Sequence, residues 1–183
     1  MSGCGYHFEE RGETRTTITV PYIKNDPEGK LTSELIRQLT ASGSFEYVRE
    51  GGALTLNVTI IENKNDKIGY RYDRHEKNGR LTHRLVPTEN RKTIAAEITL
   101  VEEVSLRELI KPTLVRGAAD YDYVGAHSIR DLSFINDKGE RQTVSSFSQG
   151  QLDSVEGAQD DALIPAYRIL AQKIVDGLIQ QTW

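Results

Sequence analysis

The sequence predicts a single α+β domain in which two helices lie on one face of a mostly antiparallel or mixed β-sheet. Apolar residues recur at helical spacing near both ends of the chain, and segments of strict apolar and polar alternation fill its centre. No repeat or linker divides the 183 residues, a length that can bury a sizeable core. We therefore expect the order β-α-β-β-β-α with an extra hairpin, and a single domain over residues 17–183.

The two helices have recognisable start and stop signals. The first is expected over residues 27–42, because the Asp26-Pro27 pair suits an N-cap followed by the first helical position, and Gly43 suits a left-handed stop. The second ends at residue 179 and has an apolar stripe two residues wide. Pro165 lies inside that stripe, so this helix either begins near residue 160 or 161 or is kinked there.

The expected strands alternate apolar and polar residues or are rich in β-branched residues. They cover residues 17–20, 54–61, 68–72, 81–86, 94–102, 113–123, 129–135 and 141–148. Three turns are expected, at residues 73–79, 87–90 and 136–139. The first contains Asn78-Gly79, a pair typical of tight hairpins.

Charge is unevenly distributed along the chain. Residues 64–92 hold nine basic and four acidic side chains, a net +5, whereas the whole chain is −4 and the remainder therefore −9. Arginines and lysines on a hairpin beside Tyr70 and Tyr72 suit an amphiphile with an anionic head. The alternative is a solvated hairpin whose charges protect an exposed strand edge from pairing with other chains.

The single cysteine, Cys4, follows Ser2 and Gly3, as in the last places of a bacterial lipoprotein signal, where the cysteine is acylated. No hydrophobic stretch precedes it, so we expect that Met1 replaces the signal. Residues 1–16 are then a lipid-anchor segment and tether, because several acyl chains hold a domain firmly to a bilayer. The alternative is a chance cysteine near a disordered end.

Signatures of catalysis are missing from the sequence. It has no phosphate-binding glycine loop, no G-x-S-x-G and no H-E-x-x-H, and its four histidines are scattered. Adjacent carboxylates such as Glu102-Glu103 diverge on a strand or helix, which does not suit paired acid-base chemistry. We expect neither a cofactor nor a metal site.

The segment Cys4-Gly5-Tyr6-His7-Phe8 resembles the mature start of the lipopolysaccharide-assembly lipoproteins of the outer membrane, the LptE family. The first strand and helix, through Asp26-Pro27 to Gly43, and the closing helix are also similar to that family. The resemblance implies a non-enzymatic outer-membrane lipoprotein on the periplasmic side that binds lipopolysaccharide and plugs the LptD β-barrel. By position, the implied candidates for the lipid head are Arg71, Arg74, Lys77, Arg80, Arg84, Arg91, Lys92 and Arg116. Residues 73–90 and 128–148 look longer than the family pattern.

Two other functions fit parts of the sequence. One is a periplasmic lipoprotein of similar fold that regulates another envelope machine, such as a cell-wall synthase, through protein contacts. The other is a cytoplasmic nucleic-acid binder that uses the basic hairpin. The acidic remainder of the chain and the lack of an aromatic-rich stacking motif disfavour the latter, so we expect no nucleic-acid partner.

Overall fold

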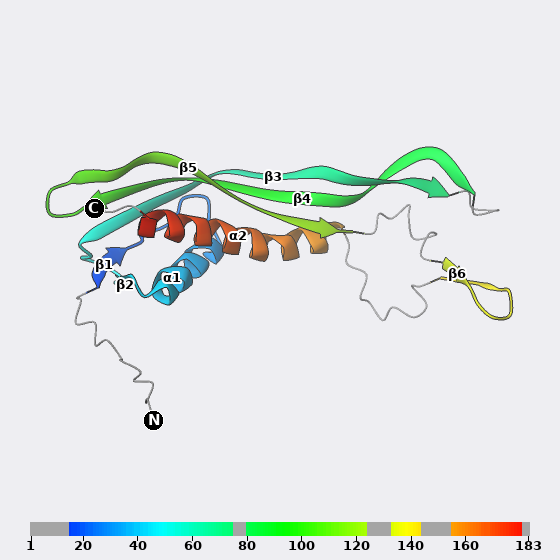
Figure 1. The fold of residues 1–183 in the computed structure, drawn as a ribbon, viewed down its shortest axis with the longest axis horizontal. Coiled ribbons are helices and arrows are strands. Elements are labelled where there is room, and N and C mark those ends of the chain that lie inside the picture. The colour runs from blue at the N-terminus through cyan, green and yellow to red at the C-terminus, as the bar shows by residue number, and fades with distance from the viewer. Residues whose placement is uncertain (1–14, 75–79, 124–132, 144–154, 181–183) are drawn as a thin grey trace, which may run out of the picture.

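The computed structural model describes residues 15–74, 80–123, 133–143 and 155–180. Cys4, Lys77 and much of the predicted hairpin at 129–148 lie outside the described residues. The elements are β1 (Thr16–Thr19), α1 (Lys30–Ser42), β2 (Phe45–Tyr47), β3 (Leu54–Arg74), β4 (Leu81–Glu102), β5 (Arg107–Asp122), β6 (Ser133–Ile135), β7 (Arg141–Thr143) and α2 (Val155–Gln180). Figure 1 shows their arrangement.

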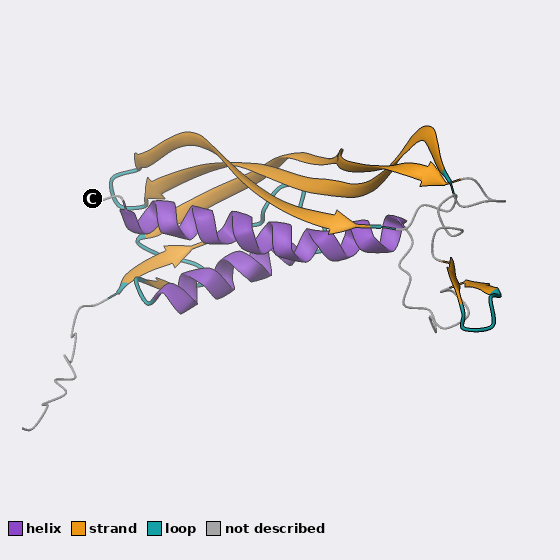
Figure 2. Ribbon diagram, turned by 45° about the vertical axis from the view of Figure 1, so that its right-hand side comes forward, coloured by secondary structure: helices purple, strands orange, loops and turns teal. Residues whose placement is uncertain are grey.

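The predicted α+β class is confirmed. Five strands form one mixed sheet in the order β2-β1-β3-β4-β5, with β1 parallel to β2 and β3, and β3, β4 and β5 antiparallel. Both helices cover the same face of this sheet (Figure 2). The strands β6 and β7 pair as a separate hairpin around the predicted turn at 136–139, where Gly139 has a φ of 80°.

The core lies between the helices and the sheet. It joins Leu31, Leu35 and Leu39 of α1 to alternate residues of β3 and β4 and to the buried stripe of α2. A Cβ added at Gly117 in β5 would lie 2.5 Å from the Ala166 carbonyl oxygen, so α2 lies directly against the β5 backbone.

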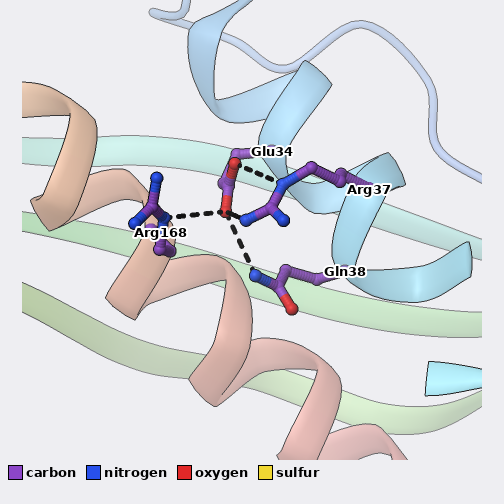
Figure 3. Close-up of polar contacts among 4 residues, drawn as sticks. All are labelled: Glu34, Arg37, Gln38 and Arg168. Atoms are coloured by element: carbon purple, nitrogen blue, oxygen red, sulfur yellow. Dashed lines mark hydrogen bonds and ion pairs between the residues drawn. The ribbon is translucent and has the colours of Figure 1, made fainter. Parts of the chain in front are cut away.

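The two helices are also joined by a polar contact at Glu34 (Figure 3). Its carboxylate accepts hydrogen bonds from Arg37 (3.0 Å from Nε) and Gln38 (3.1 Å) on α1, and it lies 3.8 Å from Arg168 of α2. The hydrogen bond from Arg37 is the main reason that the pKa of Glu34 is lowered. The ionised carboxylate thus adds one ion-pair contact between α1 and α2, whose packing is mainly hydrophobic.

The strands β3 and β4 are continuous over 21 and 22 residues, so the predicted break after residue 61 and the predicted turn at 87–90 are wrong. Instead of a break and a turn, the β3–β4 pairing has register shifts near these positions, one between Ile60 and Glu62 and another between Gly69 and Tyr70. Pro87 is tolerated because it falls at such an irregularity, where β4 has no second neighbour. Local turn signals were therefore overridden by strand pairing.

The helix starts also differ from the predictions. Residues 26–29 form a turn, and α1 begins only at Lys30, after Gly29 in the left-handed conformation (φ 64°). Asp26 still caps the helix, because its carboxylate accepts bonds from both the backbone N–H and the hydroxyl of Thr32, each at 2.9 Å. The helix α2 begins at Val155, so a start near 160 is wrong, and the exposed Pro165 lies within it.

The remaining differences concern the sheet edges. The short strand β2 was not predicted, and β5 begins at Arg107, six residues before the predicted start at 113.

Candidate functional site

The predicted basic residues do not form one surface. The structure divides them between the outer face of the sheet, the face under α2, and a hairpin arm that projects beyond the helices (Figure 1). We define the arm as residues 67–74 of β3 with residues 81–88 of β4, which lie beyond the last pair of β4 with β5, Glu89 with Asp122.

Arg91 and Arg116 belong to the outer face, where acidic side chains match their charges. Arg91 makes two hydrogen bonds to Asp120, at 2.6 and 2.8 Å. These bonds raise the pKa of Arg91 and lower that of Asp120. Arg116 lies 3.7 Å from Glu62, and both are cross-strand neighbours of Ala95, which is fully buried. These two arginines therefore complete a charge ladder over three strands.

Lys92 is adjacent to Arg91 in sequence but points to the opposite face, beneath the start of α2. Its side chain is only 3% exposed, and it pairs across the sheet with Asn65 and Ala119. Burial lowers the pKa of Lys92, and the nearby Asp160 of α2 opposes that shift in part. Lys92 is thus an interior charge and not part of a surface strip.

A polar and aromatic group adjoins Lys92 on that inner face. The hydroxyl of Tyr121 accepts a hydrogen bond from Asn90 (3.2 Å) and donates one to Asn65 (3.3 Å). The buried carbonyl oxygen Oδ1 of Asn90 has no hydrogen-bond partner among the described residues. The rings of Tyr121 and Tyr123 have centroids 6.4 Å apart. The pKa of Tyr123 is raised, first by burial and then by the proximity of Tyr121 and Tyr70.

The arm has two chemically different faces. Tyr70 is the cross-strand partner of Pro87, and Tyr72 is the partner of Leu85, so these four side chains share a face. That face is exposed, with Tyr70 and Tyr72 each 54% and Leu85 55% accessible. Tyr70 lies close enough to Tyr123 to raise its pKa, and the ring of Tyr123 neighbours that of Tyr121, so we call these three residues the tyrosine cluster.

The opposite face of the arm is basic. Arg71 pairs with Val86, and Arg84 shares the Val86 side of β4 because it lies two residues away. Arg80 is exposed immediately before β4. Residues 67–88 hold six basic and two acidic side chains, a net charge of +4. The arm therefore presents arginines on one face and exposed aromatic and aliphatic groups on the other.

Sequence reasoning identified the basic residues and Tyr70, but it missed Leu85 and the proximity of Tyr70 to Tyr123. The alternation of residues in β4 could have placed Leu85 on the same face as Pro87. The tyrosine cluster depends on register shifts that no local pattern specifies.

Other kinds of site find little support in the part of the chain that the structure describes. Within it, no three histidine, cysteine, aspartate or glutamate side chains gather as metal ligands would. Nor does any helix there combine the length and apolarity needed to cross a membrane.

The fold and the arm define a class of protein, a two-layer α+β domain with a projecting, positively charged hairpin. The family model for lipopolysaccharide assembly, LptE, matches residues 15–178, so the chain belongs to the LptE family. A comparison with curated proteins finds no match.

Several solved structures resemble the chain at low sequence identity. A minor lipoprotein from Acinetobacter baumannii is 12% identical over 88% of both chains, with a TM-score of 0.48. A putative lipoprotein from Caulobacter crescentus is 15% identical over 88% of this chain and 86% of its own, with a TM-score of 0.47. Rare lipoprotein B from Shewanella oneidensis is 10% identical over 90% and 91%, with a TM-score of 0.45. The family assignment rests on the sequence match alone.

Proposed function

We propose that this protein is a non-enzymatic outer-membrane lipoprotein, anchored on the periplasmic side through Cys4. In this proposal it binds lipopolysaccharide and acts with an LptD-like β-barrel to place that lipid in the outer leaflet. Membership of the LptE family supports the general role in lipopolysaccharide assembly. The two-faced arm is the observation that carries the ligand-binding part of the proposal.

The chemistry of the arm suits an amphiphile with phosphates on a sugar head. An arginine guanidinium can donate two parallel hydrogen bonds to a phosphate, and such charge-assisted bonds are stronger than neutral ones. The exposed rings of Tyr70 and Tyr72, together with Leu85, offer apolar surface to the non-polar parts of the same molecule. One ligand can thus engage both faces at the edge of the arm.

Within the arm, Arg71 and Arg84 are the main candidates for binding phosphate, with Arg74, Lys77 and Arg80 next to them in sequence. Arg91, Arg116 and Lys92 are weaker candidates. The two arginines lie outside the arm, on the outer face of the sheet, and Lys92 is buried under α2.

The test is binding of purified lipopolysaccharide to the double variant Arg71→Glu/Arg84→Glu. We expect its Kd to rise at least about tenfold, because a hydrogen bond to a charged group contributes roughly 1.5–3 kcal/mol. Wild-type binding should also weaken as ionic strength rises, since added salt screens exposed charges.

The matched control is Lys24→Glu/Lys111→Glu, which makes the same change in net charge at two exposed positions outside the arm. This control should bind lipopolysaccharide nearly as well as the wild type. Equal losses in both double variants would mean that net charge matters and the arm does not. Unchanged binding in the arm variant would remove the arm from the proposed site.

Anchorage and partnership are tested separately from lipid binding. Protein expressed behind a lipoprotein signal should carry acyl chains at Cys4 by mass spectrometry, and Cys4→Ser should release it from membranes. An outer-membrane β-barrel should co-purify from native membranes. Co-purification of an inner-membrane cell-wall enzyme instead would support a regulatory lipoprotein and contradict the proposed role.

A further inference from the structure

The turn between β4 and β5, residues 103–106, presents two apolar side chains to solvent. Val104 is 92% exposed and Leu106 is 75% exposed, and neither belongs to the hydrophobic core. Leu106 also has a φ of 55°, in the left-handed region that favours glycine. Among the described residues, the only other non-glycine residue with a positive φ is Asn25, a type that tolerates it better.

Folding does not account for these two side chains. The polar groups of the turn hold its shape: Ser105 donates a hydrogen bond to Glu102, and Thr55 donates one to Glu103. Glycine at position 106 would adopt the same backbone without the steric cost, and a polar residue at 104 would be better solvated. A strained and exposed leucine beside an exposed valine therefore indicates a contact outside the domain.

The turn lies at the end of the sheet where the chain enters the domain, opposite the arm (Figure 1). Glu102 pairs with Leu54, which pairs with Ile18 of β1. Ile18, Leu54 and Glu102 thus form one row across the sheet. Thr16 lies two residues before Ile18 and Val104 lies two residues after Glu102, so both are about 7 Å outside this row, towards the same end of the sheet. Only β3 separates β1 from β4, a lateral distance of roughly 10 Å.

Cys4 precedes Thr16 by twelve residues, which can span at most about 40 Å. A bilayer held by an acylated Cys4 therefore lies within about 40 Å of this end of the sheet, which is the end closest to the anchor. We propose that Val104 and Leu106 insert into the surface of that bilayer and form its second contact with the domain. This inference rests on the lipid anchorage proposed above.

The turn has no basic side chain that would bind an anionic lipid, so its contact with a bilayer depends on its apolar side chains. Glu103 in the turn accepts a hydrogen bond from Thr55 of β3, and the preceding Glu102 accepts one from Ser105. Arg107, which follows the turn, is the cross-strand partner of Glu102. The contact should therefore form on zwitterionic lipid and be insensitive to salt, unlike binding of an anionic head by the arm.

The test uses acylated protein on zwitterionic phosphatidylcholine vesicles that contain brominated acyl chains. The reporter is Val104→Trp in a Trp183→Phe background, which leaves one tryptophan in the chain. Its emission should shift to the blue and be quenched by the bromines, to the same extent at low and high salt. Adding Leu106→Gly should reduce the quenching at least twofold. That variant keeps the backbone of the turn, which unfolding in urea should confirm.

The matched control is His83→Trp in the same background, an exposed position on the arm at the opposite end of the sheet. Its emission should be unquenched. If the protein binds the vesicles in a flotation assay but the tryptophans at positions 104 and 83 have the same emission, the inference is wrong and the lipid anchorage is unaffected. A reporter shielded only in complex with the barrel would also overturn it, in favour of a protein contact. Protein that is neither acylated nor vesicle-bound would defeat the anchorage and this inference together.

Discussion

The ammonium group of Lys92 differs from the other basic groups because it lies inside the domain. Methionine has a similar length, so Lys92→Met removes a desolvated charge and keeps most of the packing. The acidic group that then loses its basic neighbour is Asp160, which is exposed to solvent. We expect Lys92→Met to be neutral or to raise the free energy of unfolding by about 1 kcal/mol at pH 7, because a poorly paired buried charge costs stability.

The pH dependence of the same variant tests the burial directly. The pKa of Lys92 is lower in the folded state than in the unfolded chain, so folding disfavours the charged form. Wild-type stability, relative to Lys92→Met, should therefore rise as the pH increases through the folded pKa toward about 10.4, the unfolded value. Urea unfolding from neutral to alkaline pH measures this difference. A clear loss of stability in the variant at pH 7 would instead reveal a favourable ion pair with Asp160.

At the scale of elements, the approach of α2 to β5 depends on Gly117. A Cβ at this position would meet the Ala166 carbonyl oxygen and, at 2.7 Å, the Leu170 backbone nitrogen. We expect Gly117→Ala to lower the free energy of unfolding by about 2–3 kcal/mol, because helix backbone cannot yield as a flexible side chain can. Chemical denaturation measures the change.

Gly177 supplies the control for that substitution. It lies within α2, and a Cβ there would have no atom within 4 Å. Gly177→Ala should raise the free energy of unfolding by about 0.5–1 kcal/mol, the usual helix preference for alanine. Similar losses at positions 117 and 177 would show that the α2–β5 contact is looser than the structure indicates.

The elements that the sequence predicted well are those whose signals act over long windows. The apolar stripe of α2 and the alternation at the start of β3 survive small local errors. The turn at 87–90 and the start of α1 were wrong because strand pairing and the distant Asp26 cap decide those boundaries. Both outcomes depend on contacts between segments, which local propensity does not contain.

The candidate site was less predictable for a related reason. Alternation alone shows that Arg91 and Lys92 point to opposite faces of the sheet. It does not show that Arg91 pairs with Asp120, or that α2 covers Lys92. The tyrosine cluster depends on irregularities near Gly69 that shift the register of β3 and β4. The sequence therefore located the basic segment, and the pairing of distant strands selected its accessible part.

On the scale of the whole molecule, two different exposed surfaces lie at opposite ends of one long sheet. The arm carries the basic residues and the aromatic face at one end, whereas the turn at 103–106 and the start of β1 lie at the other (Figure 1). The main core cluster occupies the middle and, among the described residues, takes no side chain from positions 61–93. The arm should thus be separable from folding.

Excision of the arm tests that separation. Lys67 and Asn90 are direct cross-strand partners, so residues 68–89 can be replaced by Asn-Gly, which closes a two-residue hairpin. We expect the shortened protein to keep its circular dichroism spectrum and to lose no more than about 2 kcal/mol of unfolding free energy, since Val86, which lies outside the main core cluster, is the buried apolar side chain removed among the described residues. Its binding of lipopolysaccharide should weaken at least about tenfold, as for the charge-reversal variant. A folded, shortened protein that binds lipopolysaccharide like the wild type would place the binding site on the body of the domain, and the nearest alternative would then be the inner face around Lys92.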